Sequence, residues 1–574
     1  MSSKTKKIII VSSAVLLILL IAGFLFIYPR IKYLTYLIDK PSELFSINSL
    51  VNDVDEEFIE EYNPKTQRAF DVLHYDIKIE LLPELSEIKG EAAIKIKVND
   101  KSQRNIDLNF YDNMKINLLT MDGTKTGYKR TETNLSVSTV SVLPETVTVK
   151  IKYEGKPKSL GFGSFNFDKV KNGYMIYTLN EPVFASTWFP CIDLPDDKAL
   201  TDIFITNDSM YTSLSNGKLV ETKIEGNKKT FHWKTFYPIS TYLVAVYSAQ
   251  YKSKSEKYFS MSKDSVELAY YALPENFNEA MKDFSDHKNY LNTFEKLFGS
   301  YPFAKEKYSI AEFGWRLGAM ENQTITGIGT RYLSGMKLFR DMIIHELAHS
   351  WWGNAVSPKT WKDIWLNEGF ATYSEALYWE MQSGFEALQT TLIPKFAKFS
   401  SGTLYSPGDQ LFTRLVYDKG AWVLHMLRKE VGDSAFFEII RNYFETYKYK
   451  NADTEDFKNI CEKISGKKLK FFFDQWIYKG EGIIEADYDW SVKKESDNFT
   501  VEIFLEQLQK GYDIYKFPLD IKIIFQDGGN EAKTFYVDQK EERILLITKQ
   551  KPSEILFDPD KWLLAEFVKK NDNR

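Results

Sequence analysis

The stretch HELAHSWWGN, residues 345–354, sets two histidines four residues apart in an apolar segment. On a helix such residues lie about 40° apart around the axis and about 6 Å apart along it, so His345 and His349 can direct their imidazoles at one ion. Glu346 lies about 100° from His345 and flanks the ion, where a base would face a water molecule. Two histidines on a packed helix would give the same letters, so the motif alone does not establish a metal site.

A third ligand is offered by WLNEGFATYSE, residues 365–375. Catalytic zinc sites use three protein ligands, and Glu368 can complete the set. Gly353 and Pro358 predict a loop between two helices, the second of which returns past the first. Glu375 follows seven residues later on nearly the same helical face, so we expect it to hold a ligand histidine through a hydrogen bond. The alternative for Glu375 is an ordinary surface carboxylate.

The N-terminal region contains IIIVSSAVLLILLIAGFLFIY, residues 8–28, which carries no charge. At about 1.5 Å per residue this segment spans about 31 Å, the thickness of a hydrocarbon core. A signal peptide has a shorter apolar part and a small-residue cleavage site, whereas this segment ends in Phe26, Ile27 and Tyr28. The sequence therefore predicts an uncleaved transmembrane helix, with a cleaved signal as the alternative. Lysines lie on both sides of this segment, so their charge does not decide its orientation in the membrane. We expect a single-pass cell-membrane protein whose catalytic domain lies outside the cytoplasm.

Alternation with period two, as in YDIKIEL over residues 75–81, predicts a sheet of antiparallel strands with one solvent-exposed face. Helical patterns replace it from about residue 275, and alternation returns after the GEG at 480–482. The sequence thus predicts a multidomain α+β fold. Its expected parts are a tail with a transmembrane anchor (1–30), a tether (31–65), an N-terminal β-domain (66–252), a mostly helical metal domain (253–482) and a C-terminal β-sandwich (483–574).

Composition excludes some function classes. The formal net charge of −5 provides no basic face of the kind that nucleic acids require, so we expect no nucleic-acid partner. Cys191 and Cys461 are too few for a disulfide framework and are predicted to be free, buried thiols. The remaining histidines have no partner at ligand spacing and are expected to be structural; they are His74, His232, His287 and His425.

Four motifs follow one another along the chain: NEPVFASTWFPCIDLPDDKA (180–199), GAMEN (318–322), HELAH with WLNEG, and YDKGA (417–421). In this order they resemble the zinc aminopeptidases of the aminopeptidase N and leukotriene hydrolase type, which are gluzincin metallopeptidases. The resemblance covers about residues 70–567. It implies a thermolysin-like zinc domain and a single zinc ion per chain.

The resemblance also implies a role at each matching position. His345, His349 and Glu368 bind the zinc ion, Glu346 acts as the general base, and Tyr417 donates a hydrogen bond to the developing oxyanion. Glu181 and Glu321 bind the free α-ammonium group of a peptide. The GAMEN backbone pairs with the substrate as an added strand; its residues are Gly318, Ala319, Met320, Glu321 and Asn322.

These features predict a membrane-anchored aminopeptidase that acts on peptides with a free N-terminus and contacts the bilayer through residues 8–28. An endopeptidase or epoxide hydrolase on the same scaffold is one alternative, and a catalytically inactive peptide-binding ectodomain is another. The presence of both Glu181 and Glu321 favours the aminopeptidase. Many members of this type carry a C-terminal helical domain over the cleft, so a homo-oligomer partner could close it here. The letters do not specify the preferred first residue of a substrate.

Overall fold

The computed structural model describes residues 58–59, 62–139 and 142–570. Within these residues, no helix is long and apolar enough to cross a bilayer. The predicted anchor, residues 8–28, lies outside the described residues, as does most of the predicted tether. The last part of that tether is packed instead of extended into solvent, because Tyr62 is buried and its carbonyl accepts a hydrogen bond from Asn109 Nδ2 at 3.0 Å.

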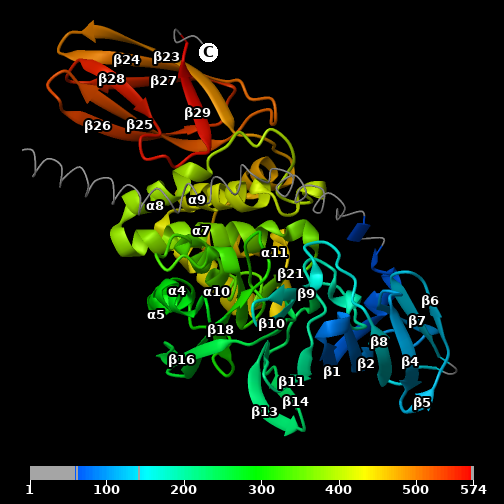
Figure 1. Ribbon diagram of the computed structural model, residues 1–574. Helices are drawn as coiled ribbons and strands as arrows, with labels where there is room; N and C mark the ends of the chain where they lie inside the picture. Colours follow the sequence, from blue (N-terminus) through cyan, green and yellow to red (C-terminus); the bar gives the residue numbers. More distant parts are fainter. Residues whose placement is uncertain (1–57, 60–61, 140–141, 571–574) are drawn as a thin grey trace, which may run out of the picture. The chain divides into compact units, whose positions relative to one another are not determined.

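The first part of the described chain is built from three sheets (Figure 1). The largest has the order β13-β14-β11-β1-β2-β8-β4-β5, with bounds Lys218–Glu225, Lys228–Lys234, Leu200–Asp208, Phe70–Leu82, Glu87–Val98, Thr146–Gly155, Met114–Met121 and Thr124–Lys125. The second has the order β12-β15-β10-β9, with bounds Thr212–Ser215, Val246–Ala249, Gly173–Leu179 and Ser164–Val170. The third has the order β3-β7-β6, with bounds Asn105–Asn109, Asn134–Ser138 and Tyr128–Arg130.

Alternating side chains explain strand β1. Tyr75, Ile77 and Ile79 are buried on one face, as the sequence pattern predicted, while Lys78 is exposed on the other. The pairing is antiparallel with β2 but parallel with β11, which corrects the expectation of a purely antiparallel sheet. Between β1 and β11 the chain adds β2, β4, β5 and β8 to the same sheet. It then leaves the sheet after Gly155 and returns at Leu200, so β11 can run in the same direction as β1.

The metal region combines helices with a sheet of order β16-β17-β18-β20-β19. The strand bounds are Lys252–Phe259, Ser265–Ala272, Lys307–Phe313, Ile325–Gly329 and Ala319–Met320. The α-helices are α4 to α12, with bounds Phe277–Asp283, His287–Phe298, Arg340–Ala348, Trp365–Ser383, Phe385–Leu392, Gly420–Val431, Asp433–Tyr447, Thr454–Ser465 and Lys470–Phe473. A short parallel pair, β21 with β22, joins Val356–Pro358 to Lys450–Ala452. The helical pattern of the sequence had given no sign of β18, β19 and β20.

Helices α7 and α9 pass very close to each other at Gly369 and Gly420 (Figure 1). A Cβ atom at Gly420 would lie 2.8 Å from the Cα atom of Gly369, so neither position has room for a side chain. This close contact places Glu368, which directly precedes Gly369, next to the turn that precedes α9. That turn, Leu415–Lys419, is a single turn of π-helix and contains Tyr417.

The C-terminal part contains two sheets. One has the order β27-β24-β23-β29, with bounds Glu541–Thr548, Asn498–Gln507, Ile484–Glu495 and Ala565–Lys569; the other has the order β26-β25-β28, with bounds Asn530–Val537, Phe517–Phe525 and Pro552–Phe557. Phe557 of β28 contacts Tyr488 of β23 and Phe567 of β29, with ring centroids 4.1 and 5.6 Å away. The two sheets therefore pack face to face.

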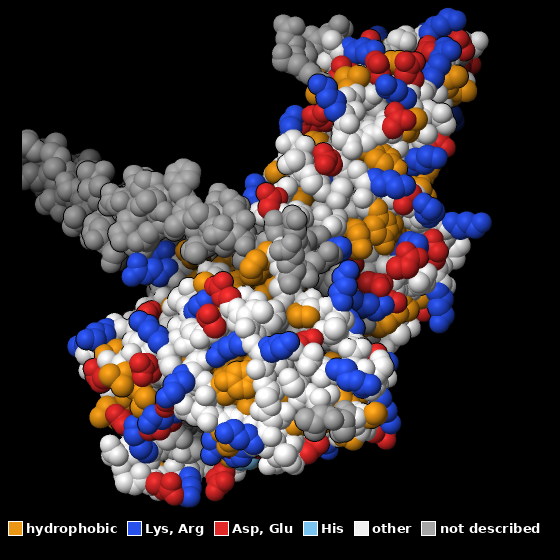
Figure 2. Space-filling model, turned by 90° about the vertical axis from the view of Figure 1, so that its right-hand side faces the viewer, with side chains coloured by type: hydrophobic (Ala, Val, Ile, Leu, Met, Phe, Trp, Pro, Cys, Tyr) orange, Lys and Arg blue, Asp and Glu red, His pale blue; other side chains and the backbone are white. Residues whose placement is uncertain are grey.

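Charged side chains of both signs are intermixed on the molecular face in Figure 2. Many charged side chains of the described residues form ion pairs; Glu91, for example, accepts from Lys150 at 2.8 Å and from Lys152 at 3.1 Å. The described surface in this view is typical of a solvated globular protein.

Candidate metal centre and cleft

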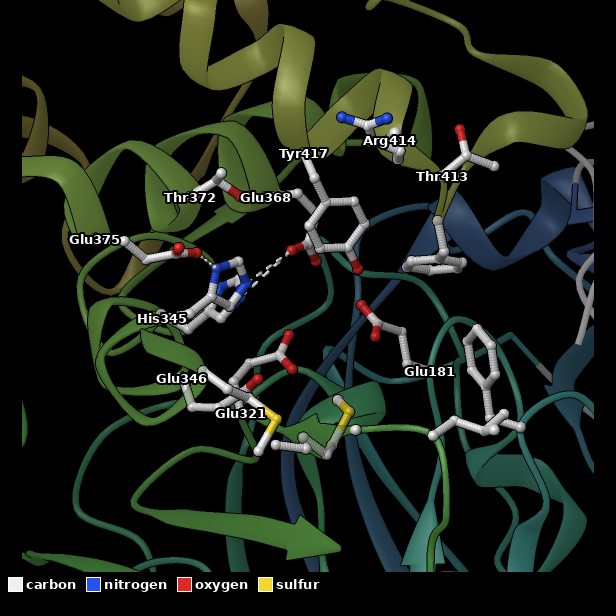
Figure 3. Close-up of a pocket in the computed structure, with 18 of the residues that line it drawn as sticks. Glu181, Glu321, His345, Glu346, Glu368, Thr372, Glu375, Thr413, Arg414 and Tyr417 are labelled. Atoms are coloured by element: carbon white, nitrogen blue, oxygen red, sulfur yellow. Dashed lines mark hydrogen bonds and ion pairs between the residues drawn. The ribbon is translucent and has the colours of Figure 1, made fainter. Parts of the chain in front are cut away.

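Two helices supply the candidate metal ligands. His345 lies in the last turn of α6, His349 follows directly after that helix, and Glu368 lies in the first turn of α7. The two Nε2 atoms are 3.1 Å apart, and Glu368 Oε2 lies 3.3 Å from His345 Nε2 and 3.4 Å from His349 Nε2. Three donor atoms from separate turns thus form a nearly equilateral triangle (Figure 3).

This triangle fits a zinc ion. Tetrahedral zinc with bonds of about 2.0 to 2.1 Å separates its ligand atoms by about 3.3 to 3.4 Å, which matches the observed distances. Two imidazoles and one carboxylate are also a donor set of catalytic zinc sites, in which a fourth position stays open. Among the described residues, two groups of donors could hold a metal ion, and both include Glu368. Of the two, only the triangle of His345, His349 and Glu368 contains histidines.

Hydrogen bonds orient both imidazoles. His349 Nδ1 lies 2.9 Å from the carbonyl oxygen of Trp352, which can only accept, so Nδ1 carries the proton and Nε2 is left for the metal. His345 Nδ1 lies 2.9 Å from Oε1 of Glu375, whose other oxygen accepts from Lys395 at 2.9 Å. Glu375 is buried, so the alternative of a solvated surface carboxylate is wrong.

The electrostatics of the triangle favour a cation. Burial opposes protonation of His345, but its hydrogen bonds with Glu368 and Glu375 outweigh burial and raise the pKa of the imidazole to about 10. Burial likewise opposes protonation of His349, yet Glu321 and Glu368 raise its pKa to about 9. For Glu368, burial is outweighed by the two histidines, which lower its pKa to about 2. The cluster therefore stabilises positive charge at its centre.

Glu346 lies beside the triangle and does not take part in it. Its side chain is buried, and no described residue hydrogen-bonds to its Oε2 atom. Burial raises the pKa of this carboxyl to about 8. Figure 3 shows the carboxyl directed into the cavity, next to that of Glu321. A buried carboxylate with a free oxygen beside a metal site can accept a proton from a molecule in the cavity.

Two further glutamates form an acidic pocket next to the metal site. Glu181 follows β10 and Glu321 follows β19, and each has an Oε1 atom to which no described residue hydrogen-bonds. Their carboxylates and that of Glu368 have oxygens within 4.8 Å of one another. Burial, and then the charge of Glu321, raise the pKa of Glu181 well above its usual range; burial also raises the pKa of Glu321. Neighbouring carboxylates repel one another when ionised, so a cation among them would stabilise their charged forms.

Tyr417 closes one side of the cavity. Its ring stacks on that of His345, with centroids 5.9 Å apart, and Figure 3 shows its hydroxyl directed between Glu368 and Glu181. Burial, and then the surrounding carboxylates, raise the pKa of this phenol well above its usual value, so the hydroxyl keeps its proton. It can therefore donate a hydrogen bond to an oxygen that becomes negative in the cavity.

One cavity of about 530 Å³ unites these residues. Of the residues predicted from the sequence it is lined by Glu181, Gly318, Ala319, Met320, Glu321, His345, Glu346, His349, Glu368, Glu375 and Tyr417. Asn322 is the exception: its side chain is buried and donates to the hydroxyl of Tyr247 at 2.7 Å. The sequence gave no indication of several other lining residues, which are scattered along the chain; they include Phe162, Leu179, Trp315, Lys395, Phe412 and Arg414.

The β-rich part of the chain holds the turn behind the metal helix, Gly353–Ala355. Lys198 Nζ donates to the carbonyls of Asn354 and Ala355 at 2.9 and 3.1 Å, and Tyr242 Oη donates to that of Gly353 at 3.1 Å. Asn354 Nδ2 in turn donates to the backbone carbonyl of Glu321 at 2.7 Å. The position of His349 relative to Glu321 is therefore fixed from outside helix α6.

The other histidines and both cysteines lie away from the cavity. His74 and His232 share Asp202, with Nε2 atoms 2.9 and 2.6 Å from its carboxylate oxygens. His287 and His425 are buried, and burial lowers the pKa of each to about 3. Both thiols are free and buried.

Two family models match the chain. The Peptidase M1 N-terminal domain matches residues 72–243, and the Peptidase family M1 domain matches residues 282–476. Together they include the acidic pocket, the metal triangle and Tyr417.

Curated relatives agree with these matches. The chain is similar to "Aminopeptidase A" of Gloydius brevicauda, with 27% identity over 86% of this chain and 54% of the relative. It is also similar to "Probable aminopeptidase 2" of Sulfurisphaera tokodaii, with 31% identity over 69% of this chain and 52% of the relative. The chain spans about half the length of these curated relatives.

Solved structures share the fold. Aminopeptidase A of Legionella pneumophila in complex with aspartic acid superposes with a TM-score of 0.77 and 18% identity, over 88% of this chain and 60% of the other. The M1 zinc metallopeptidase of Deinococcus radiodurans superposes with a TM-score of 0.63 and 22% identity, over 72% of this chain and 94% of the other. The donor set and this family indicate zinc as the cofactor. From the two matching models and the relatives, the chain belongs to peptidase family M1.

Proposed function

We propose that the protein is a membrane-anchored zinc aminopeptidase, which hydrolyses the first peptide bond of peptides with a free N-terminus. The observation that carries this proposal is the acidic pocket of Glu181 and Glu321, which shares one cavity with the metal triangle. A metal site alone would be compatible with cleavage anywhere along a peptide. A pocket beside it that binds the α-ammonium group of a peptide restricts cleavage to the first peptide bond.

His345, His349 and Glu368 would hold the zinc ion. Bound zinc supplies the Lewis acidity that activates water and polarises a carbonyl group. Glu346 accepts the proton of the attacking water at its free carboxylate oxygen and passes it to the nitrogen of the departing amine. The buried position of Glu346 supports this role, because a carboxylate without other partners has its oxygen available for the proton.

Substrate register follows from the acidic pocket. The α-ammonium group of a peptide binds between Glu181 and Glu321 and supplies the cation that these carboxylates lack. The first carbonyl then lies beside the metal triangle, and bonds further along the peptide lie beyond it. Strand β19 ends its sheet with Ala319 and Met320 on the cavity, so the substrate backbone can pair with that edge.

The proposed activity is tested with a panel of aminoacyl fluorogenic amides, each assayed with and without a chelator. We expect turnover that the chelator abolishes and that added zinc restores. N-acetylated versions of the same amides should not be cleaved, because acetylation removes the charge that the acidic pocket binds. Equal cleavage of free and acetylated substrates would instead indicate an endopeptidase.

Replacing Tyr417 with phenylalanine should lower kcat about 100- to 1000-fold, the usual loss for one oxyanion donor. The ring stacking on His345 stays possible, so zinc content should remain at one ion per chain. Steady-state kinetics and metal analysis of the variant measure both quantities. An unchanged kcat would exclude the hydroxyl from the reaction.

Replacing Glu321 with glutamine should lower kcat/KM about 10- to 150-fold, the range of one hydrogen bond to a charged group. Glutamine keeps the shape but removes the charge that the ammonium group requires, so KM should rise and the loss of register should lower kcat as well. Glu267→Gln is the matched control, because Glu267 is exposed on β17 of the same sheet. If both variants behave alike, the acidic pocket does not bind the substrate.

The chain organisation is also proposed, with residues 8–28 as a single-pass anchor and the catalytic part outside the cytoplasm. The parts would be a tail and anchor (1–30), a tether (31–65), a β-domain (66–252), a thermolysin-like domain (253–482) and a β-sandwich (483–574). The uncharged length of the anchor supports this arrangement. The full-length protein should stay in the membrane fraction after an alkaline carbonate wash and should be cleaved by protease added outside intact cells. Recovery in the soluble fraction would contradict the anchor.

A further inference from the structure

We propose that the cavity selects peptides whose first residue has a large apolar side chain, above all an aromatic one. This inference rests on the proposed aminopeptidase activity and names its substrate class. It is carried by aromatic and aliphatic side chains that line the cavity beside the acidic pocket, and by the ion pairs of the basic side chains there.

The position of the first side chain follows from covalent geometry. The α-ammonium nitrogen and the side chain are attached to the same Cα atom, by bonds of about 1.5 Å each. With the nitrogen held between Glu181 and Glu321, the side chain must begin within about 3 Å of it. Leu179, two residues before Glu181, and Met320, directly before Glu321, are both buried on the cavity. The first atoms of the side chain therefore meet apolar groups.

Three aromatic rings extend this apolar wall. Phe162 lies 5.7 Å from Trp315 and 5.3 Å from Phe412 between ring centroids, and both contacts are edge-to-face. The three residues come from distant segments, are only partly buried, and all line the cavity. Partly exposed rings that meet at a cavity provide contact area for another ring, which prefers the same edge-to-face geometry.

Trp315 is held in place by the substrate-binding segment itself. A Cβ atom at Gly318 would lie 3.3 Å from Cζ3 of Trp315, so the ring packs directly against the GAMEN backbone. The apolar wall is thus rigidly connected to the segment that carries Glu321. A side chain that fits this wall also places its own ammonium group correctly.

The charged residues of the cavity disfavour an acidic first residue. Lys395 pairs with Glu375 at 2.9 Å, and Arg414 pairs with Asp418 at 2.5 Å. The described lining residues contain no other lysine or arginine, so a carboxylate side chain would meet no unpaired cation beside the aromatic wall. It would also lie close to Glu181, and two neighbouring carboxylates repel each other when both are ionised.

The expected preference can be given a size. One extra methylene group in an apolar pocket changes kcat/KM about 10- to 200-fold. A benzyl group buries several times the area of a methyl group, so kcat/KM for the amide of Phe should exceed that for the amide of Ala by at least about 10-fold. The amides of Leu and Met should lie between these two. Those of Glu and Asp should be the poorest, below that of Ala.

The test compares kcat/KM for the amides of Phe, Leu, Ala, Glu and Lys with the full-length zinc-loaded protein. If none is cleaved, the proposed function fails. If Ala, Glu or Lys is the best substrate, the activity stands and the inference about the first residue is overturned. The two failures are therefore distinguishable within one experiment.

Variants of Phe412 link the preference to the aromatic wall. Phe412→Ala should lower the ratio of kcat/KM for Phe over Ala at least 5-fold, whereas Phe412→Leu should retain most of it. Phe259→Ala is the control, because Phe259 is 70% exposed and does not line the cavity. A ratio is the readout because partial misfolding lowers both rates equally. An unchanged ratio in Phe412→Ala overturns the assignment of the wall.

Discussion

Replacing Glu346 with glutamine should lower kcat on a good aminoacyl amide by at least about 1000-fold, near the upper part of the range for a positioned general base. Glutamine has the shape of glutamate but cannot accept the proton of the attacking water. Because Glu346 lies outside the triangle of donor atoms, the variant should still contain one zinc ion per chain. Kinetics and metal analysis on the same preparation measure the two effects separately.

Glu430→Gln provides a matched control for this prediction. Glu430 is also a buried helical glutamate, but it lies near the end of α9 and pairs with Lys467 at 3.0 Å, away from the cavity. Its replacement should leave kcat within a factor of about three, since changes away from the reacting atoms are mostly changes in stability. Full turnover by the Glu346 variant would show that another group accepts the proton.

Replacing Glu368 with alanine should remove most of the zinc and, with it, the activity. This carboxylate supplies one of the three donor atoms, and its loss leaves only two of them, His345 Nε2 and His349 Nε2. The affinity for zinc should fall by more than the roughly 10- to 100-fold that is typical when only a partner of a ligand is lost. Competition with a chelator of known affinity measures this loss in the folded protein.

Glu375→Gln is the graded comparison for that experiment. Its carboxylate touches His345 Nδ1 but supplies no donor atom to the triangle, so the loss of zinc affinity should stay within about 10- to 100-fold. A smaller effect for Glu368→Ala than for Glu375→Gln would exclude Glu368 as a ligand. Circular dichroism of both variants verifies that each remains folded.

The fold could be predicted where a periodic pattern reflects burial on one face. Strand β1 shows this, because its buried Tyr75, Ile77 and Ile79 alternate with more exposed residues. Strand β18 was missed because every one of its residues, Lys307–Phe313, is buried, so its sequence does not alternate. The parallel pairing of β1 with β11 was missed for another reason: it joins segments more than a hundred residues apart, which a local pattern does not report.

Some residues of the candidate site could likewise be predicted from the sequence, and others could not. His345, His349 and Glu368 could be found from spacing because two helices and one loop connect them, and Glu375 from the helical repeat. Glu181 and Tyr417 lie more than two hundred residues apart, so their presence in one cavity followed only from family resemblance. The same holds for Phe162, Trp315 and Phe412, which no motif marks. Asn322 belongs to the GAMEN motif, yet its side chain supports Tyr247 instead of facing the cavity.

The hydrogen bonds on the turn Gly353–Ala355 have a consequence for how such a chain can change during evolution. Lys198 and Tyr242 are contributed by the β-rich part, and the amine of Lys198 donates hydrogen bonds to two carbonyl groups of the turn. Recombination that exchanged the β-rich part for an unrelated one would remove Glu181 and these donors in a single step. Substitutions on one side of the boundary between the β-rich part and the metal region are therefore expected to select for compensating ones on the other.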